Sequence, residues 1–405
     1  MISTNKLNYT KLLNYLFIAY AFAVPISKAG TNIFETLIFI FWIMEGRWEE
    51  KFSLIKTNLL SISILLLIVV SILYIPLSSN TQFALNYIGK YRHFLIILVM
   101  LTSLKKEYFN TILSAFIMGM LISEIMSYGI FFEIIHYKDK LPSDPAPFMD
   151  HISYSSFLSF TSILLLVKIY SSSSLKEKIF YILFFVTLTI NLFINGGRTG
   201  QVTFIAILII SFFILTKSKL KAFLISAILI STIIIGAYNF SPNFPTRVNA
   251  LNLEIESMIN NNNYTGSMSG RAALWIVGID KLKDNLLIGS GIGNDMQDIK
   301  KYIENRGFDY QYLKTFSDHH NVYLTMSIQY GFLGIIFLVL LLYSLFTLKF
   351  QTVEYKVLNI AFSTSFFLWS FTGMTLHNMN PMTFFTLFAG IFNAMSYLES
   401  KQTEI

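Results

Sequence analysis

Apolar residues occur along the chain in long runs that are separated by short polar segments. A helix needs about 20 predominantly apolar residues to cross a bilayer. Runs that meet or approach this length lie near 12–27, 30–45, 57–77, 91–104, 108–135, 151–170, 177–195, 199–216, 220–240, 321–348, 355–376 and 380–398. Each run is expected to be a helix, because open sheet edges and loops leave backbone polar groups unpaired in hydrocarbon. The pattern predicts an all-α integral membrane protein with about twelve transmembrane helices.

One long polar stretch interrupts this pattern. Residues 241–319 contain no apolar run of spanning length, so we expect them to form a partly helical loop domain outside the bilayer. The predicted organisation is therefore transmembrane helices one to nine in residues 1–240, the loop domain in 241–319, and the last three transmembrane helices in 320–405.

The composition agrees with a membrane protein. Hydrophobic residues make up 54% of the chain and charged residues 13%, with a mean hydropathy of +0.58, whereas soluble domains are about 25% charged. The absence of cysteine excludes disulfides and thiolate metal sites. No cleavable signal peptide is expected, because the first apolar run leads directly into the second. We attribute the net charge of +7 to lysines that flank the membrane, and not to nucleic-acid binding.

The distribution of lysine and arginine predicts the orientation. If the N-terminus is cytoplasmic, sixteen of the 30 basic residues fall in short inside segments, six in short outside loops and eight in the long loop. Short cytoplasmic loops carry the excess of basic residues in membrane proteins, and long loops contribute little to orientation. Both termini are therefore predicted to be cytoplasmic, and the long loop is predicted to face the other side.

A glycine-rich break holds Arg198 between two apolar runs, in the segment NGGRTG (195–200). The glycines permit a sharp turn and the close approach of a ligand. Backbone amides at the start of the next helix, together with a guanidinium group, form an anion site. Alternatively, the segment is an ordinary interhelical turn whose arginine reaches lipid headgroups.

A second arginine, Arg271, follows GSMSG (266–270) in the long loop. Ser269 is expected to be the N-cap of a helix that runs to about Lys283. An arginine in the first turn of a helix opposes the macrodipole, and a bound phosphate would offset both positive charges. The alternative is a solvent-exposed arginine without a ligand.

The segment DHHN (318–321) opens the tenth run. An imidazole titrates near neutral pH, so His320 is suited to remove the proton of a sugar hydroxyl. Asp318 is a candidate to orient His320, although residues two apart do not share a helix face. The alternative is a structural histidine at the membrane interface.

Other polar residues are predicted to lie on the same face of the membrane. Of these, Lys90, Arg92 and His151 join Asp318 and Asn321 as candidates for additional substrate binding, and His377 lies in the last outside loop. Within the hydrocarbon, Glu124 is the residue that favours a transporter, because buried carboxylates in membrane helices commonly carry protons.

Several motifs are absent from the sequence. It contains no phosphate-binding Walker loop, no dinucleotide fingerprint and no HExxH. Glu254 and Glu256 are the nearest approach to an Asp-x-Asp motif and are interpreted as an exposed loop face. Asp295 and Asp298 are interpreted as part of a capped turn after GSGIG (289–293). The sequence therefore indicates neither a metal nor any other cofactor.

The chain resembles the O-antigen ligase and O-antigen polymerase family of bacterial envelope glycosyltransferases. The motifs that carry the resemblance are GGRTG (196–200), Gly270-Arg271 followed by Trp275, DNLLIGSGIG (284–293) and HNVYL (320–324), together with twelve spans and one long loop between the ninth and tenth. The similarity covers the architecture over most of the chain, but distinctive motifs occur only from about 195 to 335.

The resemblance implies a GT-C-like fold in the bacterial inner membrane, with the active site facing the periplasm. It implies inverting transfer of a glycan from an undecaprenyl-diphosphate carrier, without ATP and without metal, to a sugar of lipid A–core. By position, Arg198 and Arg271 would bind the diphosphate and His320 would be the base. His320 is preferred over His319 because the family histidine precedes an asparagine. The alternatives are a polymerase that uses a second lipid-linked glycan as acceptor, and a transporter of the same glycan.

Overall fold

The computed structural model describes residues 8–241 and 243–402, and these residues form helices without any strand. The helices of the bundle are α1 Tyr9–Ala23, α2 Lys28–Glu45, α3 Trp48–Ile55, α4 Leu59–Leu73, α5 Thr81–Gly89, α6 Leu95–Ser103, α7 Phe109–Phe131, α8 His151–Ser171, α9 Leu175–Ile194, α10 Arg198–Leu215, α11 Lys219–Phe240, α16 Val322–Tyr330, α17 Phe332–Phe346, α18 Val353–Ser370 and α19 Met379–Lys401. Short 3-10 helices lie at η1 Ile75–Leu77, η2 Lys90–Phe94 and η3 Lys106–Tyr108.

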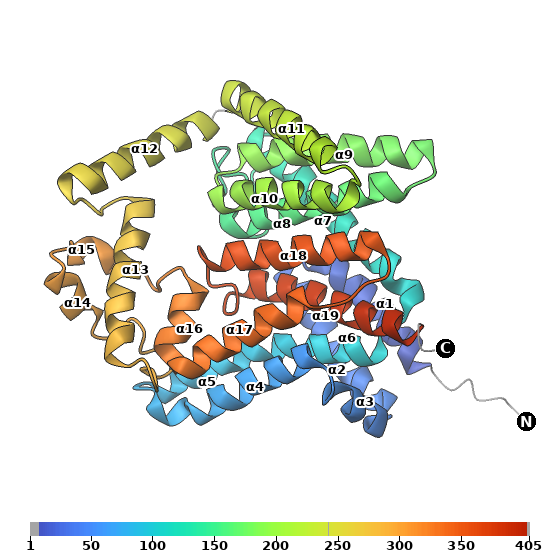
Figure 1. The fold of residues 1–405 in the computed structure, drawn as a ribbon, viewed down its shortest axis with the longest axis horizontal. Helices are drawn as coiled ribbons and strands as arrows, with labels where there is room; N and C mark the ends of the chain where they lie inside the picture. Colours follow the sequence, from blue (N-terminus) through green and yellow to red (C-terminus); the bar gives the residue numbers. More distant parts are fainter. Residues whose placement is uncertain (1–7, 242, 403–405) are drawn as a thin grey trace, which may run out of the picture.

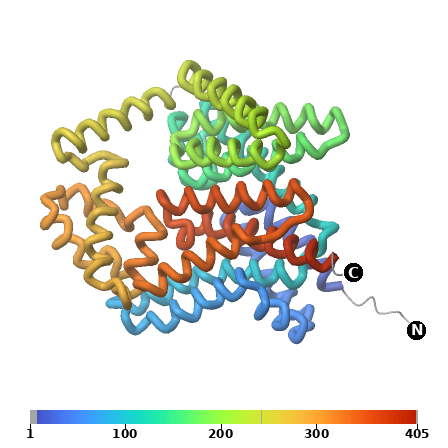
Figure 2. The backbone as a smooth tube through the Cα atoms, viewed as in Figure 1, coloured from blue at the N-terminus to red at the C-terminus, as the bar shows by residue number. Residues whose placement is uncertain are grey.

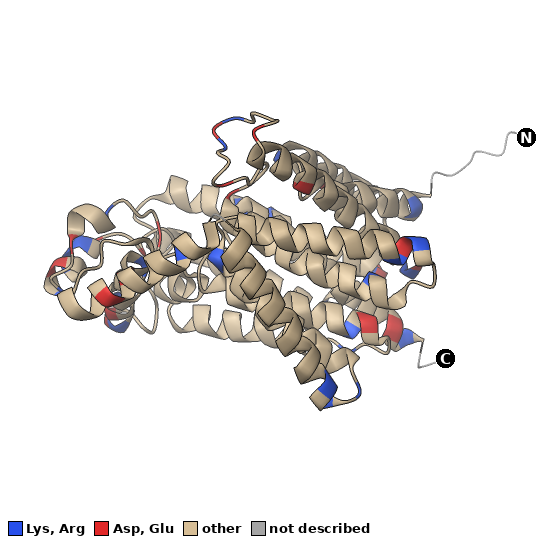
Figure 3. Ribbon diagram, turned by 90° about the horizontal axis from the view of Figure 1, so that it is seen from above, with Lys and Arg blue, Asp and Glu red and all other residues tan. Residues whose placement is uncertain are grey.

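The polar stretch forms a separate helical unit at one end of the bundle. Its helices are α12 Asn243–Asn261, α13 Ser267–Asp284, α14 Ile299–Asn305 and α15 Tyr310–Leu313. They lie together at the left of Figure 1, whereas the two chain ends emerge at the right, and the tube in Figure 2 shows the same separation. We call the first side the loop end and the second the termini end. Charged residues gather at these two ends and are sparse along the length between them (Figure 3).

Among the described residues, six helices are long and apolar enough to cross a membrane. They are Lys106–Phe131, α8, α9, α10, α11 and α19, and the bent pair α3 and α4 would make a seventh. The chain is thus a multi-pass membrane protein. All twelve predicted runs contain helix, but several of those helices are too short to span alone, such as α6 with 9 residues. Twelve spans and a GT-C-like fold therefore remain predictions.

The centre of the bundle is packed with phenylalanine. Phe160, Phe362, Phe384 and Phe388, from α8, α18 and α19, lie with ring centroids 4.6–6.0 Å apart. In α19, 83% of the most apolar 18-residue stretch is buried. In α11 only 17% of the corresponding stretch is buried, and its leucines and isoleucines face outward. An outer helix can remain apolar all round because lipid, unlike water, is a good solvent for such side chains.

The tenth predicted run is not one helix, which corrects the sequence-based expectation for 321–348. It breaks at Gly331, whose φ is +59°. Gly289 of the loop domain sits against this break, and a Cβ on Gly289 would lie 2.5 Å from the amide nitrogen of Gly331. The amides of Ser290 and Gly291 donate to the carbonyls of Ile328 and Gln329 at 2.8 and 3.0 Å. The loop thus pairs with the carbonyls that the break leaves open, and so anchors the loop domain to α16.

We expect Gly289→Val to destabilise the protein by at least about 2 kcal/mol, because it adds a branched side chain at a φ of +82° against the Gly331 backbone. Thermal unfolding of the purified protein in detergent measures the change. Gly236→Ala is the matched control, since nothing lies within 4 Å of a Cβ at that position in α11. Equal melting temperatures for both variants would contradict this account of the break.

Candidate functional site

Arg198, Arg271 and His320 all lie at the loop end, although they come from three separate elements. Arg198 is the first residue of α10, Arg271 lies in the second turn of α13, and His320 immediately precedes the N-cap of α16. The side chains of all three are half-buried. The structure therefore gathers them at one end of the bundle, and their contacts show how each is held.

The turn before Arg198 is shaped by helix packing. A Cβ on Gly197 or Gly200 would lie 2.1–2.5 Å from atoms of Ser155 and His151, so these two glycines are required by the close approach of α10 to α8. Gly197 donates its amide to Oδ1 of Asn195 at 3.0 Å, which fixes the turn. The packing explains both glycines without a ligand, in contrast to the sequence-based interpretation.

Gly196 serves a different contact. A Cβ at this position would lie 3.2 Å from Nη2 of Arg247, an exposed residue of α12. The guanidinium of Arg247 therefore rests on the turn that leads to Arg198. Sequence analysis missed Arg247, because a single arginine in an amphipathic stretch of a long loop carries no motif.

The helix that carries Arg271 begins earlier than predicted. Gly266 is its N-cap, and Ser269 is the third helical residue, whose Oγ accepts the amide of Gly266 at 2.9 Å. Oε2 of Glu254, from α12, accepts the amides of Met268 at 2.7 Å and Ser269 at 3.3 Å. Two interpretations are thereby corrected: Ser269 is not the N-cap, and Glu254 is not an ordinary exposed side chain, because its carboxylate complements the positive end of α13.

Arg271 lies in an environment that disfavours its charge. Burial lowers its pKa, and the nearby positive charge of Arg198 lowers it further, while the carboxylates of Asp318 and Glu254 act in the opposite direction. Its Nε is buried and has no hydrogen-bond partner. Two guanidinium groups that repel one another, one with an unused donor, form a site that an anion would stabilise.

Asp318 holds His320 by two contacts. Oδ1 of Asp318 accepts the backbone amide of His320 at 2.7 Å and lies 2.7 Å from its Nδ1. The ring reaches the carboxylate two residues away because this segment is not helical, and the φ of His320 is +49°. Burial disfavours ionisation of Asp318, but the hydrogen bond and charge of His320 outweigh it and keep the pKa of Asp318 below its usual value. With the Nδ1 proton on the carboxylate side, Nε2 of His320 is the free acceptor.

The neighbouring histidine, His319, has a different environment. Its side chain is completely buried, with Nδ1 3.6 Å from Oδ2 of Asp295. Gln329 donates to the other oxygen of Asp295 at 2.8 Å, and Trp275 donates to the backbone carbonyl of His319 at 3.0 Å. His319 is thus part of the packing between α13 and α16. Asp295 belongs to this packing as well, and its interpretation as a simple capped turn was incomplete.

A second basic pair lies nearby, formed by Lys90 and His377. The ammonium group of Lys90 donates to Nε2 of His377 at 3.0 Å, and the imidazole stacks on Tyr87 with centroids 3.8 Å apart. Burial lowers the pKa of His377 to about 4, helped by Lys90 and opposed by Asp295 and Asp318. His377 therefore stays neutral and orients Lys90. Its buried Nδ1 has no partner, as with Nε of Arg271.

The other candidate residues have contacts of their own. Arg92 donates to the carbonyl of Gly89 and to Asn32 of α2, and lies 3.9 Å from Glu35, so its partners are structural. His151 pairs with Asp144 at 3.1 Å. Asn321 is the N-cap of α16, where its Oδ1 accepts the amide of Leu324 at 3.0 Å. Within the described residues, no hydrogen bond or ion pair joins these three side chains to the side chains of Arg198, Arg271 or His320.

The fold and this site define a helical multi-pass membrane protein with arginines and histidines gathered at one end of its bundle. Residues 183–339 match the family model described as O-antigen ligase, so this part of the chain forms an O-antigen ligase family domain, as its motifs indicated. The match includes Arg198, Arg271 and His320, whereas Lys90 and His377 lie outside it. No curated protein matches the chain. The matched domain implies a membrane enzyme of the glycosyltransferase or ligase type that acts on lipid-linked glycans in O-antigen biosynthesis.

The lowered pKa of His377 predicts a pH dependence of stability. Between its ordinary value of 6.5 and about 4, the unfolded chain binds a proton at this histidine that the folded protein does not. Stability should therefore fall as the pH drops through this window, by at most about 3 kcal/mol from this group. His377→Gln, which keeps an acceptor for Lys90, should show a smaller loss of melting temperature between pH 7 and pH 5. Exposed His136→Gln is the control, and identical pH profiles for all three proteins would refute the prediction.

Proposed function

We propose that the protein transfers a glycan from an undecaprenyl-diphosphate carrier to a hydroxyl of lipid A–core, as an inverting O-antigen ligase. The observation that best supports this is the pair of arginines at the loop end. Arg198 and Arg271 are close enough for the charge of one to lower the pKa of the other, and Nε of Arg271 has no protein partner. A diphosphate would neutralise both charges and accept the unused donor.

In the proposed reaction, the acceptor hydroxyl oxygen attacks the anomeric carbon from the side opposite the diphosphate. A carbon–oxygen bond forms to the acceptor, the bond to the diphosphate breaks, and the hydroxyl proton passes to Nε2 of His320. The carrier leaves as undecaprenyl diphosphate, whose developing charge the two guanidinium groups stabilise. A single displacement inverts the anomeric centre. Diphosphate is a good leaving group, so the step needs neither ATP nor an assigned metal.

Asp318 has the role of a positioning residue in this proposal. It fixes the His320 ring by the contacts at Nδ1 and at the backbone amide, and its charge stabilises the imidazolium that forms during transfer. Lys90, held by His377, and Arg247, at the turn before Arg198, add positive charge around the same end. These two are further candidates for contacts to the donor phosphates or to an acidic acceptor.

The orientation belongs to the proposal as well. The lysine and arginine distribution favours a cytoplasmic location for the termini end, and the family resemblance implies that the loop end faces the periplasm at the bacterial inner membrane. A polymerase would use the same site with a second lipid-linked glycan as acceptor. A transporter is favoured only by Glu124, a buried carboxylate of α7 whose Oε1 has no partner. No second buried carboxylate of the described residues contacts Glu124, so we prefer the enzyme.

His320→Ala should reduce transfer by about 10²–10⁴-fold, because the general base is lost. Arg198→Ala and Arg271→Ala should be similarly impaired, and Arg→Lys should restore activity only in part, since lysine lacks the bidentate fork. The measurement is in vitro transfer with purified protein, a defined lipid-linked glycan and lipid A–core. Lys283→Ala, an exposed residue of α13, is the control. Normal activity of both arginine-to-alanine variants would contradict the diphosphate assignment.

The choice of acceptor separates the ligase from the polymerase in the same assay. The ligase should glycosylate lipid A–core and leave a second carrier-linked glycan unmodified. Chain extension on the carrier would establish the polymerase instead. If no glycan were transferred to either acceptor but lipid-linked glycan crossed a proteoliposome membrane, the transporter would replace both.

Asp318→Asn should lower kcat by roughly 10–100-fold with little change in KM, because it disturbs the base and not substrate binding. The pH profile of transfer should also change, because a charged group beside the base is replaced by a neutral one. Asp139→Asn, an exposed carboxylate between α7 and α8, is the matched control. An unchanged kcat and pH profile would mean that Asp318 has only a structural role.

A further inference from the structure

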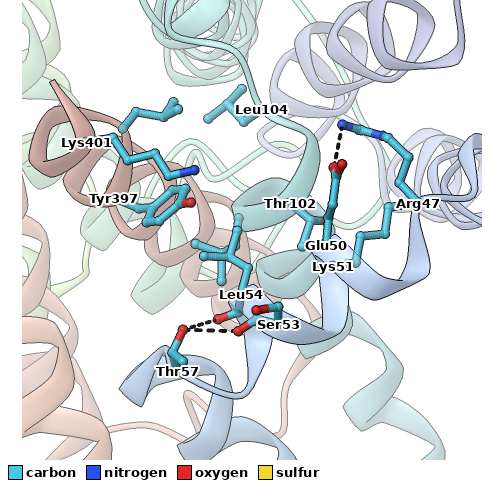
Figure 4. A pocket seen from close by; sticks show the side chains of 12 residues that line it. Arg47, Glu50, Lys51, Ser53, Leu54, Thr57, Thr102, Leu104, Tyr397 and Lys401 are labelled. Carbon is cyan, nitrogen blue, oxygen red and sulfur yellow. Dashed lines mark hydrogen bonds and ion pairs between the residues drawn. The ribbon is translucent and has the colours of Figure 1, made fainter. Parts of the chain in front are cut away.

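A pocket of about 460 Å³ lies at the termini end, on the side of the bundle opposite the loop domain (Figure 1). Its walls come from α3, the end of α6 and the last turns of α19. Figure 4 shows Arg47 and Glu50 on one side, and Lys401 and Tyr397 on the other. Nothing in the proposed transfer reaction uses these residues, so the pocket needs a separate explanation.

The basic side of the pocket is built on a buried carboxylate. Arg47 follows Gly46, and both have left-handed φ values, +57° and +69°. Glu45 lies behind them, with its two oxygens 2.6 Å from Arg47 and 3.0 Å from the ammonium group of Lys51. Lys51 is almost fully buried and also donates to the carbonyl of Trp42 at 2.7 Å. The cations are therefore held in place before any ligand arrives.

The lining of the pocket is more basic than acidic. Arg47, Lys51 and Lys401 line the pocket together with one carboxylate, that of Glu50, while Glu45 behind the wall pairs with both Arg47 and Lys51. Glu50 lies 3.5 Å from Arg47, and its side chain is 75% exposed, so this ion pair is solvated and readily exchanged for another anion. On the wall opposite Arg47, which α19 forms, the ammonium group of Lys401 lies 4.8 Å from the ring centroid of Tyr397. An anion between the two walls could therefore contact Arg47 on one side and Lys401 on the other.

The position and the apolar lining indicate a lipid. α3 and α4 meet at 90°, and Trp48 and Phe52 of α3 are 37% and 61% exposed. A short helix that turns away from a span and exposes aromatic rings is typical of the membrane interface. Leu54, Leu101 and Leu104 add an apolar side to the same cavity. An occupant needs a negative head and an apolar tail.

We propose that this pocket binds the phosphate headgroup of an anionic phospholipid, with Arg47 and Lys401 as the contacts from its two walls. Basic pockets between transmembrane helices on the cytoplasmic side bind such headgroups, and the termini end is the side predicted to be cytoplasmic. The bound lipid links α3, near the start of the chain, to the end of α19. It acts at the opposite end of the bundle from the diphosphate site, so the proposal does not depend on the transfer reaction.

Native mass spectrometry of the full-length protein, titrated with phosphatidylglycerol and with phosphatidylcholine of the same acyl chains, tests this. Phosphatidylglycerol should bind at least tenfold more tightly. The double variant R47Q/K401Q should weaken its binding at least tenfold. The charge-matched control K176Q/K178Q, at the start of α9, should stay within twofold of the unmodified protein. Glycerol 3-phosphate, which has the headgroup charge without acyl chains, should not displace the lipid.

Ser53→Phe is the second test, because it fills the cavity from exposed Ser53 without changing any charge. Its melting temperature and that of the double variant establish that each protein is folded. Loss of phosphatidylglycerol binding in Ser53→Phe supports the pocket even if the double variant does not fold. Unchanged binding in Ser53→Phe would overturn the proposal, as would displacement by glycerol 3-phosphate, which would identify a site for free phosphate.

Discussion

The repulsion between Arg198 and Arg271 is the constraint on which the loop end depends. Two guanidinium groups in a half-buried setting repel one another, and burial makes the charge of Arg271 more costly. The protein offsets this in part with Asp318 and Glu254, which lie within electrostatic reach of Arg271. The compensation is incomplete, because a buried donor of Arg271 stays unpaired. Sites that are strained without a ligand are common where function requires one.

Several contacts hold the loop domain in the position that keeps Arg271 close to Arg198. Glu254 of α12 caps α13, Trp275 of α13 bonds to the carbonyl of His319, and the Gly289 loop pairs with the broken end of α16. Without such contacts, α13 could move away and separate the arginines. The buried Asp295 and His319 pair adjoins the half-buried Asp318 and His320 pair, because the two histidines are consecutive residues. The pair of Asp295 and His319 therefore contributes to packing, while the pair of Asp318 and His320 belongs to the candidate site.

The two ends of the bundle use charge in different ways. At the loop end, Arg198 and Arg271 come from distant parts of the chain, and the carboxylates of Asp318 and Glu254 oppose the effect of burial and of Arg198 on Arg271. At the termini end, Arg47 and Lys51 share the buried carboxylate of Glu45, and their cavity also has an apolar side. Between the ends, apolar helices pack through phenylalanine rings and close glycine contacts. A membrane explains this division, because charge is tolerated at the interfaces and is costly in hydrocarbon.

The sequence by itself determined the class of the protein, the location of the helical runs, the long polar stretch and the resemblance to the O-antigen ligase family, because hydropathy and short motifs are local properties. Arg198, Arg271 and His320 could be named for the same reason. Local pattern did not reveal the break at Gly331, the Glu254 cap on α13, or the places of Arg247 and His377, since each depends on a partner far away in the chain. The pairing of His320 with Asp318 was doubted on helical spacing and occurs because the segment is not helical. Only the tertiary structure decided these contacts, because they form where the fold brings distant elements together and excludes water between them.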